Sequence, residues 1–366
     1  MIDRRPTIGI DASRLSVGQR TGTETYTAEL LAAMAALDPL ETFRLYLNAH
    51  RPPPDLHPLG EPRCIPLPRL WTHARLSLEM VRHRPDVLFV PAHVVPVIHP
   101  KSVVTIHDLG YLHEPDAHPL GQRRMLDLTT RWSARSATRI VAVSESTKGD
   151  LIDRYGVLPS KIDVIPHGVS DAFQPSGPAD MDRIRDAYQL PDRFVLAVGT
   201  IQPRKNLSTL ANALAGVSDL PLVIAGKPGW LADQVMADLV DPIKAGRVRM
   251  LGYVPDGDLP ALYGAASCVA FVSRFEGFGL PAIEAMACGT PVVASDRGAL
   301  PEVVGVAGLI VDADDPGQIA VAIRSIVDDP VLHARLRGAG LNRATLYTWR
   351  ATAEATLRVL REVAEG

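Results

Sequence analysis

Short apolar runs recur along the second half of the chain and alternate with segments of helical periodicity. The runs are rich in β-branched residues and lie at residues 194–199, 221–226, 247–252, 268–273, 291–295 and 308–312. Between them, stretches such as "NLSTLANALAG" and "PAIEAMACG" place apolar residues three or four positions apart. Strands that are apolar throughout and alternate with helices indicate a parallel sheet that is covered on both faces.

The first half carries the same pattern less regularly. We expect a strand at residues 7–11, followed by a helix from about Thr23 to Leu37. Further strands are expected at residues 43–47, 86–90, 102–106, 139–143 and 162–166. Near the end of the chain, one helical stripe contains Trp349, Ala353, Leu357, Leu360 and Val363.

The length of 366 residues exceeds one typical core, so the pattern predicts two doubly wound α/β domains. We expect the first domain at residues 1–173 and the second at residues 194–348. The segment between them, residues 174–193, lies in a stretch rich in proline and glycine and is interpreted as a linker.

Composition narrows the class of protein. The chain is 46% hydrophobic and 22% charged, as is usual for a globular protein. Its net charge of -3 gives no reason to expect nucleic acid as a partner. Its cysteines (Cys64, Cys268 and Cys288) fit neither a metal spacing nor a disulfide set. No segment approaches the ~20 apolar residues of a membrane helix, and the N-terminal apolar run is too short for a signal peptide. We therefore expect a cytoplasmic protein.

Candidate chemistry lies where the strands end, because ligands of open α/β sheets bind at their carboxyl ends. The run 268–273 is followed by "RFEGFGLPAIEAMACG", in which Pro281 and Gly289 fit the start and the stop of a helix. Gly277 and Gly279 then lie at a helix N-terminus, where free N–H groups and the helix dipole favour an anion.

The same stretch contains two carboxylates, Glu276 and Glu284, eight residues apart. They would repel an anion unless they accept hydrogen bonds from hydroxyl groups, so the combination predicts a ligand with phosphate and polyol groups, as in a nucleotide sugar. Each glutamate alone also fits a structural role: Glu276 as a solvated loop residue, and Glu284 as a first-turn partner of the helix dipole.

A second candidate is "VGTIQPRKNLSTL", in which Arg204 and Lys205 follow a strand and Asn206 is expected to cap the next helix. Adjacent cations at this place predict a phosphate site, although such a pair also fits a solvated basic turn. His107 follows the strand 102–106 directly and fits a catalytic or a structural role equally.

Other motifs have weaker implications. The loop "RTGTETYT" contains Gly22 and follows Gly18, but it matches neither G-x-G-x-x-G nor the Walker A sequence. "DAD" at residues 312–314 imitates a metal-binding D-x-D, yet Asp315 and Pro316 are expected to begin a helix there, so no metal site is predicted. His93 and His167 fit a place that faces the acceptor or the hinge, and they fit a structural role in a turn at least as well; Ser144 is expected to cap a helix.

Taken in order, several motifs resemble the retaining glycosyltransferases of family four. They are Glu276 and Glu284 in an E-x7-E pattern, "GTIQPRKN", "TIHD", "VAVSESTKGDL", "VIPHGV" and "TGTETYT", and they span nearly the whole chain. The resemblance implies the GT-B architecture, in which two Rossmann-like domains face a central cleft. It also implies that the C-terminal helix, residues 349–366, packs back on the first domain.

The resemblance implies a donor site as well. Arg204 and Lys205 would hold the diphosphate, Glu276 would contact sugar hydroxyls, and Glu284 would contact the ribose. His107 would contact the sugar from the first domain. The other implied donor-binding positions are Gly22, Gly199, Gly252, Val254, Phe278, Gly279 and Leu280.

In one respect the sequence departs from the family's commonest pattern. Many members carry Gly-Gly in the loop that closes over the phosphates, whereas here Arg20 and Thr21 precede Gly22.

We therefore expect a metal-independent, cofactor-free retaining enzyme that moves a hexose from a nucleotide sugar to a saccharide or glycolipid hydroxyl. The "PRKN" and "TGTETYT" forms resemble bacterial mannosyl- and rhamnosyltransferases of surface polysaccharides, which favours GDP-mannose. Two alternatives remain open: a nucleotide-sugar epimerase or hydrolase of the same fold, and a non-catalytic nucleotide-sugar-binding module.

Two stretches of the first half are locally basic. "LWTHARLSLEMVRHR" holds Arg75 and Arg82 beside an apolar stripe, and "QRRMLDLTTRWSARSATR" brings together Arg124, Arg131 and Arg135. Such faces are usually solvated, and such stripes usually belong to a core. A lipid-linked acceptor would nevertheless lie at an anionic surface, so we expect weak, salt-sensitive contact with the inner face of a membrane.

Overall fold

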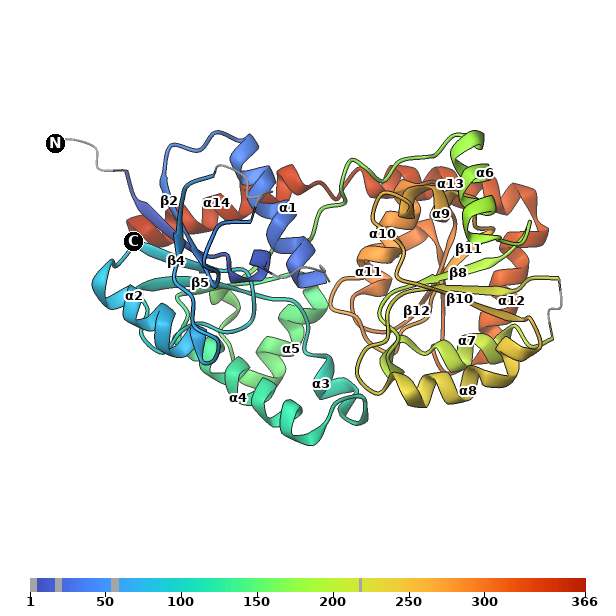
Figure 1. The fold of residues 1–366 in the computed structure, drawn as a ribbon, viewed down its shortest axis with the longest axis horizontal. Helices are drawn as coiled ribbons and strands as arrows, with labels where there is room; N and C mark the ends of the chain where they lie inside the picture. Colours follow the sequence, from blue (N-terminus) through green and yellow to red (C-terminus); the bar gives the residue numbers. More distant parts are fainter. Residues whose placement is uncertain (1–4, 17–21, 54–58, 217–218) are drawn as a thin grey trace. The chain divides into compact units, whose positions relative to one another are not determined.

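The computed structural model describes residues 5–16, 22–53, 59–216 and 219–366, and the chain divides into two compact units (Figure 1). Unit 1 consists of the residues up to Leu109, of Leu120–Gly168 and of Thr348–Gly366. Unit 2 consists of Gly110–Pro119 and Val169–Tyr347. The chain therefore passes between the units four times.

Unit 1 is built on a parallel sheet with the strand order β3-β2-β1-β4-β5-β6-β7. Its strands are β1 (Thr7–Asp11), β2 (Thr42–Leu47), β3 (Glu61–Cys64), β4 (Val87–Val90), β5 (Lys101–Ile106), β6 (Arg139–Ala142) and β7 (Ile162–Val164). All strands expected from the sequence are present. The unexpected strand, β3, contains Pro62, which is tolerated because β3 is an edge strand.

The helices of unit 1 include the one expected after β1 and the C-terminal one. They are α1 (Gly22–Ala36), α2 (Ser77–Arg82), α4 (Leu120–Ser136), α5 (Glu145–Tyr155) and α14 (Trp349–Glu365). Helix α14 packs on α1 and on β4, β5 and β6, and all five residues of its expected apolar stripe are buried. The final helix thus belongs to the core of unit 1.

Unit 2 is built on a parallel sheet with the order β10-β9-β8-β11-β12-β13. Its strands are β8 (Val195–Val198), β9 (Leu222–Ala225), β10 (Val248–Gly252), β11 (Cys268–Phe271), β12 (Val292–Ser295) and β13 (Leu309–Val311). Each was expected from an apolar run, and most of their residues are fully buried.

The helices of unit 2 mostly connect these strands. They are α3 (Gly110–His113), α6 (Pro178–Tyr188), α7 (Leu207–Ala213), α8 (Ala232–Lys244), α9 (Leu259–Ala265), α10 (Leu280–Ala287), α11 (Leu300–Val304), α12 (Pro316–Asp328) and α13 (Pro330–Ala344).

The stretch interpreted as a linker, residues 174–193, contains a helix. Helix α6 packs on α9, and Tyr188 and Arg183 both donate hydrogen bonds to Asp258, at 2.8 and 3.0 Å. The stretch is therefore an ordered part of unit 2, because α6 covers apolar surface of that unit with the buried Ile184.

Two predicted helix caps are confirmed. Ser144 accepts a hydrogen bond from the Thr147 N–H at 3.0 Å and begins α5, and Asp315 accepts from the N–H groups of Gly317 and Gln318 and begins α12. Among the described helices, none is long and apolar enough to cross a membrane.

Candidate functional site

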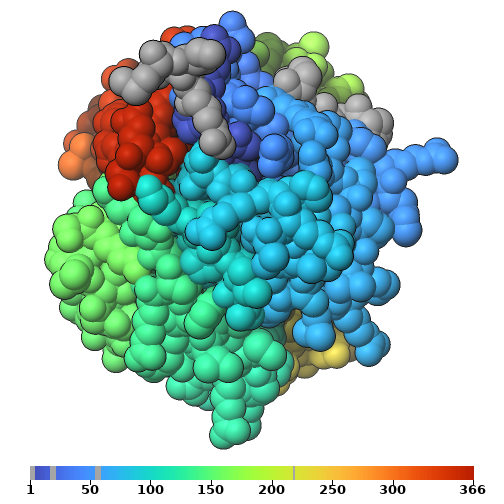
Figure 2. Space-filling view, turned by 90° about the vertical axis from the view of Figure 1, so that its left-hand side faces the viewer, coloured from blue at the N-terminus to red at the C-terminus, as the bar shows by residue number. Residues whose placement is uncertain are grey.

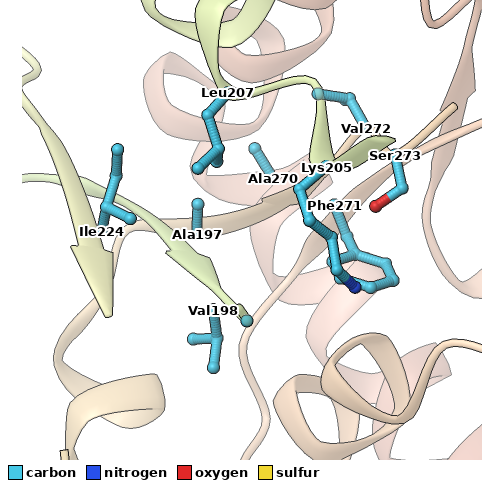
Figure 3. Close-up of a pocket in the computed structure, with 10 residues that line it drawn as sticks. Ala197, Val198, Lys205, Leu207, Ile224, Ala270, Phe271, Val272 and Ser273 are labelled. Carbon is cyan, nitrogen blue, oxygen red and sulfur yellow. The ribbon is translucent and has the colours of Figure 1, made fainter. Parts of the chain in front are cut away.

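A pocket opens at the carboxyl ends of β8 and β11 in unit 2 (Figure 3). Its lining includes Gly199, Lys205, Phe271 and Ser273. The order of the sheet reverses between these two strands, so the chain connections leave them in opposite directions and a crevice remains. The pocket therefore lies where an open α/β sheet is expected to bind a ligand.

Three charged side chains meet beside this pocket. Arg204 and Lys205 belong to a short 3-10 turn after β8, and Glu276 belongs to the loop after β11. The Lys205 Nζ lies 2.6 Å from Glu276 Oε1, and an Arg204 guanidinium nitrogen lies 2.9 Å from Glu276 Oε2. Lys205 also extends over the ring of Phe271, with its Nζ 4.8 Å from the ring centroid (Figure 3).

The charges of this cluster do not cancel. Burial alone would raise the pKa of Glu276, but the neighbouring Arg204 and Lys205 outweigh it and lower that pKa to about 2. Glu276 is thus ionised at neutral pH, and the three side chains carry one net positive charge. Because Glu276 is buried and has two cationic partners, it is not the solvated loop residue that the alternative role required.

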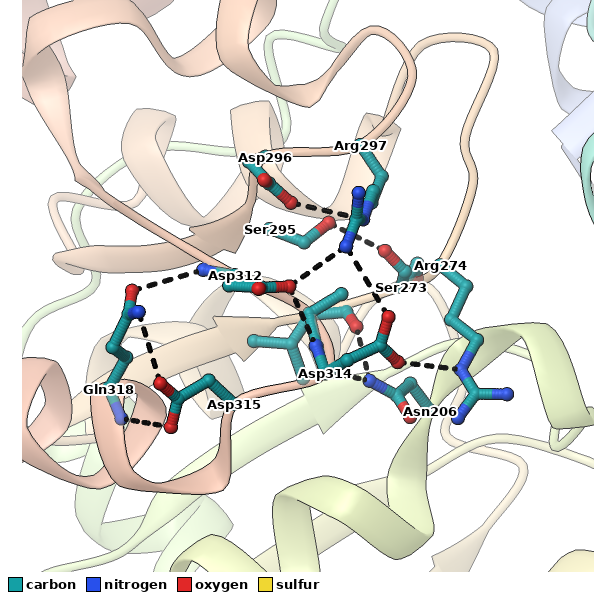
Figure 4. Close-up of polar contacts among 12 residues, drawn as sticks. Asn206, Ser273, Arg274, Ser295, Asp296, Arg297, Asp312, Asp314, Asp315 and Gln318 are labelled. Atoms are coloured by element: carbon teal, nitrogen blue, oxygen red, sulfur yellow. Dashed lines mark hydrogen bonds and ion pairs between the residues drawn. The ribbon is translucent and has the colours of Figure 1, made fainter.

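Asn206 holds the turn that carries the two cations. It has the left-handed conformation (φ 58°), and its side-chain amide donates to the carbonyls of Val272 at 3.1 Å and Ala313 at 2.6 Å. It therefore does not cap α7 with its side chain, contrary to expectation. The amide instead ties the turn to the segments that follow β11 and β13, as Figure 4 shows.

Glycines at the ends of three neighbouring strands let the backbones approach closely. Gly199 has a φ of 143°, and the N–H of Gly226 donates to the carbonyl of Gly252 at 2.7 Å. A Cβ on Gly226 would lie 1.9 Å from the Gly199 carbonyl oxygen, so no larger residue fits there. Gly199 and Gly252 thus lie along one edge of the sheet, with Val254 buried just beyond it.

The N-terminus of α10 is shaped by a second close approach. Gly279 has a φ of 101° and directly precedes α10, whose first residue is Leu280. The backbone of Glu276 accepts a hydrogen bond from the Ala299 N–H at 2.9 Å, and a Cβ on Gly298 would lie 2.3 Å from the Glu276 carbonyl oxygen. The loop that carries Glu276 into α10 is therefore packed closely against the segment Gly298–Ala299.

Glu284 lies in a different environment from Glu276. It is in the second turn of α10, past the first turn, and its Oε2 accepts a hydrogen bond from the Tyr263 hydroxyl at 2.8 Å. Burial is the main cause that raises its pKa to about 7, and the hydrogen bond from Tyr263 only partly offsets it. Two glutamates eight residues apart therefore differ by several units in acidity, because only one of them has cationic partners.

The Asp312–Asp314 segment is occupied by ion pairs (Figure 4). Arg297 lies 2.8 Å from Asp312 and 3.3 Å from Asp314, and Arg274 lies 3.4 Å from Asp314. Within the described part of the chain, no group of three or more His, Cys, Asp or Glu residues is arranged to hold a metal ion. Asp312 and Asp314 are thus paired with arginines, and Asp315 beside them begins α12.

His107 of unit 1 lies in a cluster of histidine and aromatic rings. Its backbone N–H donates to His93 Nε2 at 2.8 Å, and its own Nε2 lies 2.7 Å from the Pro91 carbonyl oxygen. Because a carbonyl only accepts, His107 Nε2 carries the hydrogen and Nδ1 is left as an acceptor. Burial, followed by the nearby His93, lowers the pKa of His107 to about 4, so the ring is neutral at pH 7.

Two of the other rings in this cluster are His167 and Tyr26. The Tyr26 ring centroid lies 4.7 Å from that of His107 and 4.8 Å from that of His167, and the His167 and Trp349 rings stack at 6.0 Å. Burial lowers the pKa of His167 well below its usual value. His93 and His167 therefore both pack against the ring of His107.

The expected site residues belong to both units. Unit 2 holds one group around Arg204, Lys205 and Glu276 and a second pair, Glu284 with Tyr263, while His107 belongs to unit 1. Gly22 begins α1, but Gly18, Arg20 and Thr21 lie outside the described residues.

Two residues of this region have roles that were not expected from the sequence. Tyr263 was missed because a tyrosine in a short apolar helix has no motif of its own. The bridging role of Asn206 was missed because its partners follow it by 66 and 107 positions.

Sequence comparisons match both halves of the chain. Residues 20–173 match the family described as Glycosyltransferase Family 4, and residues 180–343 match Glycosyl transferases group 1. The O-antigen chain mannosyltransferase B of Escherichia coli is 35% identical over 68% of this chain and 67% of that protein. A D-inositol 3-phosphate glycosyltransferase of Kineococcus radiotolerans is 34% identical over 70% of this chain, which spans 62% of that relative's length.

Solved structures match nearly the whole chain. A sucrose-phosphate synthase from Thermosynechococcus elongatus has a TM-score of 0.80 at 22% identity, covering 98% of this chain and 99% of that one. Anabaena HepE in complex with UDP and glucose has a TM-score of 0.76 at 19% identity, covering 98% and 100%. At these identities the matches establish the fold: two Rossmann-like α/β units of the GT-B class, as predicted.

Proposed function

The chain belongs to glycosyltransferase family 4, and we propose that it is a retaining enzyme that transfers a hexose from a nucleoside-diphosphate sugar. The acceptor in this proposal is a hydroxyl group of a saccharide or lipid-linked glycan. GDP-mannose is the favoured donor, because the relative from Escherichia coli is named as a mannosyltransferase of the O-antigen chain.

The observation that carries the proposal is the cluster of Arg204, Lys205 and Glu276 at the pocket of unit 2. Two cations beside a helix N-terminus suit a diphosphate, because guanidinium and ammonium groups donate charge-assisted hydrogen bonds to phosphate oxygens. A carboxylate with a pKa of about 2 stays ionised and can accept hydrogen bonds from sugar hydroxyls.

In the proposed reaction the bond between the anomeric carbon and the diphosphate breaks while the acceptor oxygen bonds to the same face. The leaving diphosphate oxygen takes the acceptor's proton. Arg204, Lys205 and the N–H groups at the start of α10 stabilise the charge that develops on the diphosphate, which is electrostatic preorganisation. His107 is proposed to accept a sugar hydroxyl hydrogen at Nδ1, since its Nε2 is committed to Pro91.

The remaining proposed contacts follow the edge of the unit 2 sheet. Glu284 would accept hydrogen bonds from the ribose hydroxyls, and the segment Gly252–Val254 would lie near the base. The backbone of Phe278–Leu280 would cap the sugar and the phosphates, and Gly199 and Gly22 would be further donor contacts.

The proposal is tested first by ligand binding and then by chemistry. Thermal unfolding is measured with GDP, UDP, dTDP and ADP, because only a nucleotide that binds the folded state raises the melting temperature. Nucleotide sugars that contain the stabilising nucleotide are then incubated with the enzyme, with and without saccharide acceptors. The anomeric configuration of the product is determined by NMR. Transfer with retained configuration supports the proposal, and an inverted product contradicts it.

The two alternatives give different outcomes in the same experiment. An epimerase or hydrolase converts the donor at full rate with no acceptor present. A binding module raises the melting temperature with nucleotide sugars but converts no donor with any acceptor. UDP is included because the matching HepE structure contains UDP and glucose.

A further inference from the structure

Helix α4 of unit 1 exposes an apolar stripe to solvent. Met125, Leu128 and Trp132 are 61, 66 and 39% exposed, and they follow one another by three and four positions, so they lie on one face of the helix. The buried residues of α4 are Thr130, Ser133 and Ala134. Met125, Leu128 and Trp132 therefore face away from the unit's core, although such a stripe usually faces a core; Leu126 is partly buried.

Helix α2 and a neighbouring loop extend this surface. The N–H of Val95 donates to Ser133 of α4 at 3.2 Å, and the N–H of Ile98 donates to Ser77 of α2 at 3.2 Å, so the loop between β4 and β5 joins the two helices. We call the exposed apolar residues of these three segments the apolar face: Leu78, Val81, Val97, Ile98, Met125, Leu128 and Trp132. Figure 2 shows the cyan to green segments that contain them on one side of unit 1.

Arginines line the α4 part of the apolar face. Arg124, Arg131 and Arg135 are exposed and lie seven and four positions apart, next to the apolar stripe on the same side of the helix. Arg131 pairs with Asp127 at 2.9 Å and lies over the ring of Tyr155. Arg124 and Arg135 form no ion pair with any described residue, so their charge is uncompensated.

The acidic residue of α2 does not cancel this charge. Glu79 is buried and forms ion pairs with Arg63, Arg75 and His83 at 2.9 to 3.7 Å. The apolar face therefore combines exposed apolar side chains, one of them a tryptophan, with positive charge on the surrounding surface.

We propose that the apolar face docks on the surface of a membrane that contains anionic lipid. Side chains such as Leu128 would insert between headgroups, Trp132 would lie at the headgroup level, and the arginines would be attracted to the negative surface potential. A second copy of the chain is a poorer partner, because a two-fold contact would bring Arg124 and Arg135 against the same arginines. This inference does not depend on the proposed function.

The test is co-sedimentation of the full chain with two kinds of vesicle: phosphatidylcholine alone, and phosphatidylcholine with phosphatidylglycerol in equal amounts. We expect binding to the anionic vesicles at low salt and release as salt is raised. The double variant Arg124→Glu/Arg135→Glu should lower the partition coefficient by about tenfold or more. Leu128→Ser with Trp132→Ser should also weaken binding, but with little change in its salt dependence.

A matched control distinguishes the effect of charges on the apolar face from the effect of the protein's net charge. Arg350→Glu with Arg358→Glu makes the same charge change on exposed positions of α14, in the same unit, and should bind as the unaltered chain does. Equal loss in the control, or no sedimentation of the unaltered chain at low salt, would overturn the proposal. So would a dimer in solution that the Leu128→Ser/Trp132→Ser variant converts to a monomer.

Discussion

Lys205 and Glu276 are joined by an ion pair of 2.6 Å although they lie 71 positions apart in the sequence. The contact forms because β8 and β11 are neighbours in the sheet and both residues follow the ends of those strands. Glu276 thereby neutralises part of the positive charge that a diphosphate would meet. The proposed diphosphate site and the proposed sugar site are electrostatically coupled through this pair.

Because of this coupling, a substitution of Glu276 should affect turnover and nucleoside diphosphate binding differently. The variant Glu276→Gln should reduce turnover by about 10²–10³-fold, since it loses a charged acceptor in the transition state. Nucleoside diphosphate should bind at least as tightly as before, because Arg204 and Lys205 lose their anionic partner. Calorimetric titration and transfer rates measure the two effects, with Glu354→Gln on the exposed side of α14 as the control. A fully active Glu276→Gln enzyme would remove Glu276 from the reaction.

Substitutions of Arg204 and Lys205 should instead weaken the binding of nucleoside diphosphate. Lys205→Ala and Arg204→Ala should each weaken nucleoside diphosphate binding by about tenfold to a hundredfold, because each removes a charge-assisted hydrogen bond. The rate of transfer should fall as well. Lys244→Ala at the exposed end of α8 is the matched control. Unchanged affinity in both site variants would exclude these residues from the phosphate site.

The raised pKa of Glu284 predicts a pH-dependent stability. Its pKa rises from 4.5 to about 7 on folding, so the folded protein binds the proton more tightly than the unfolded chain does. This contribution is fully present below pH 4.5, is lost as the pH rises to about 7, and amounts to roughly 3 kcal/mol in the free energy of unfolding.

Glu284→Gln keeps an acceptor for Tyr263 but cannot ionise. Between pH 5 and pH 8 the unaltered protein should therefore lose more unfolding free energy than the variant, as measured by urea denaturation at both pH values. Other titrating groups cancel in this difference. Equal losses in the two proteins would show that Glu284 does not titrate in this range.

Activity should survive chelation. Two cations and a helix N-terminus are placed to balance the diphosphate charge, and Asp312 and Asp314 are paired with Arg297 and Arg274. Transfer rates measured in excess EDTA should match those in untreated enzyme. A loss that Mg²⁺ or Mn²⁺ restores would contradict this prediction and direct attention back to the aspartates.

The sequence by itself determined the strands of both sheets except β3, because apolar β-branched runs between helical segments have few other ways to bury their side chains, whereas β3 is not such a run. It also indicated Arg204, Lys205 and Glu276, since each directly follows a strand and parallel strands end at a common edge. The caps at Ser144 and Asp315 were equally readable, because a cap and its partners lie within three residues.

Only the tertiary structure decided which of these residues act on one another. The pairing of Glu276 with two cations, the bond from Tyr263 to Glu284 and the bridge made by Asn206 all join segments far apart in the chain. The exposure of Leu128 and Trp132 was also beyond the sequence, since helical periodicity shows that side chains share a face but does not show what covers that face. Strand order and packing decide these long-range contacts and the exposure of side chains. They also explain why the pKa of Glu276 is low while that of Glu284 is raised.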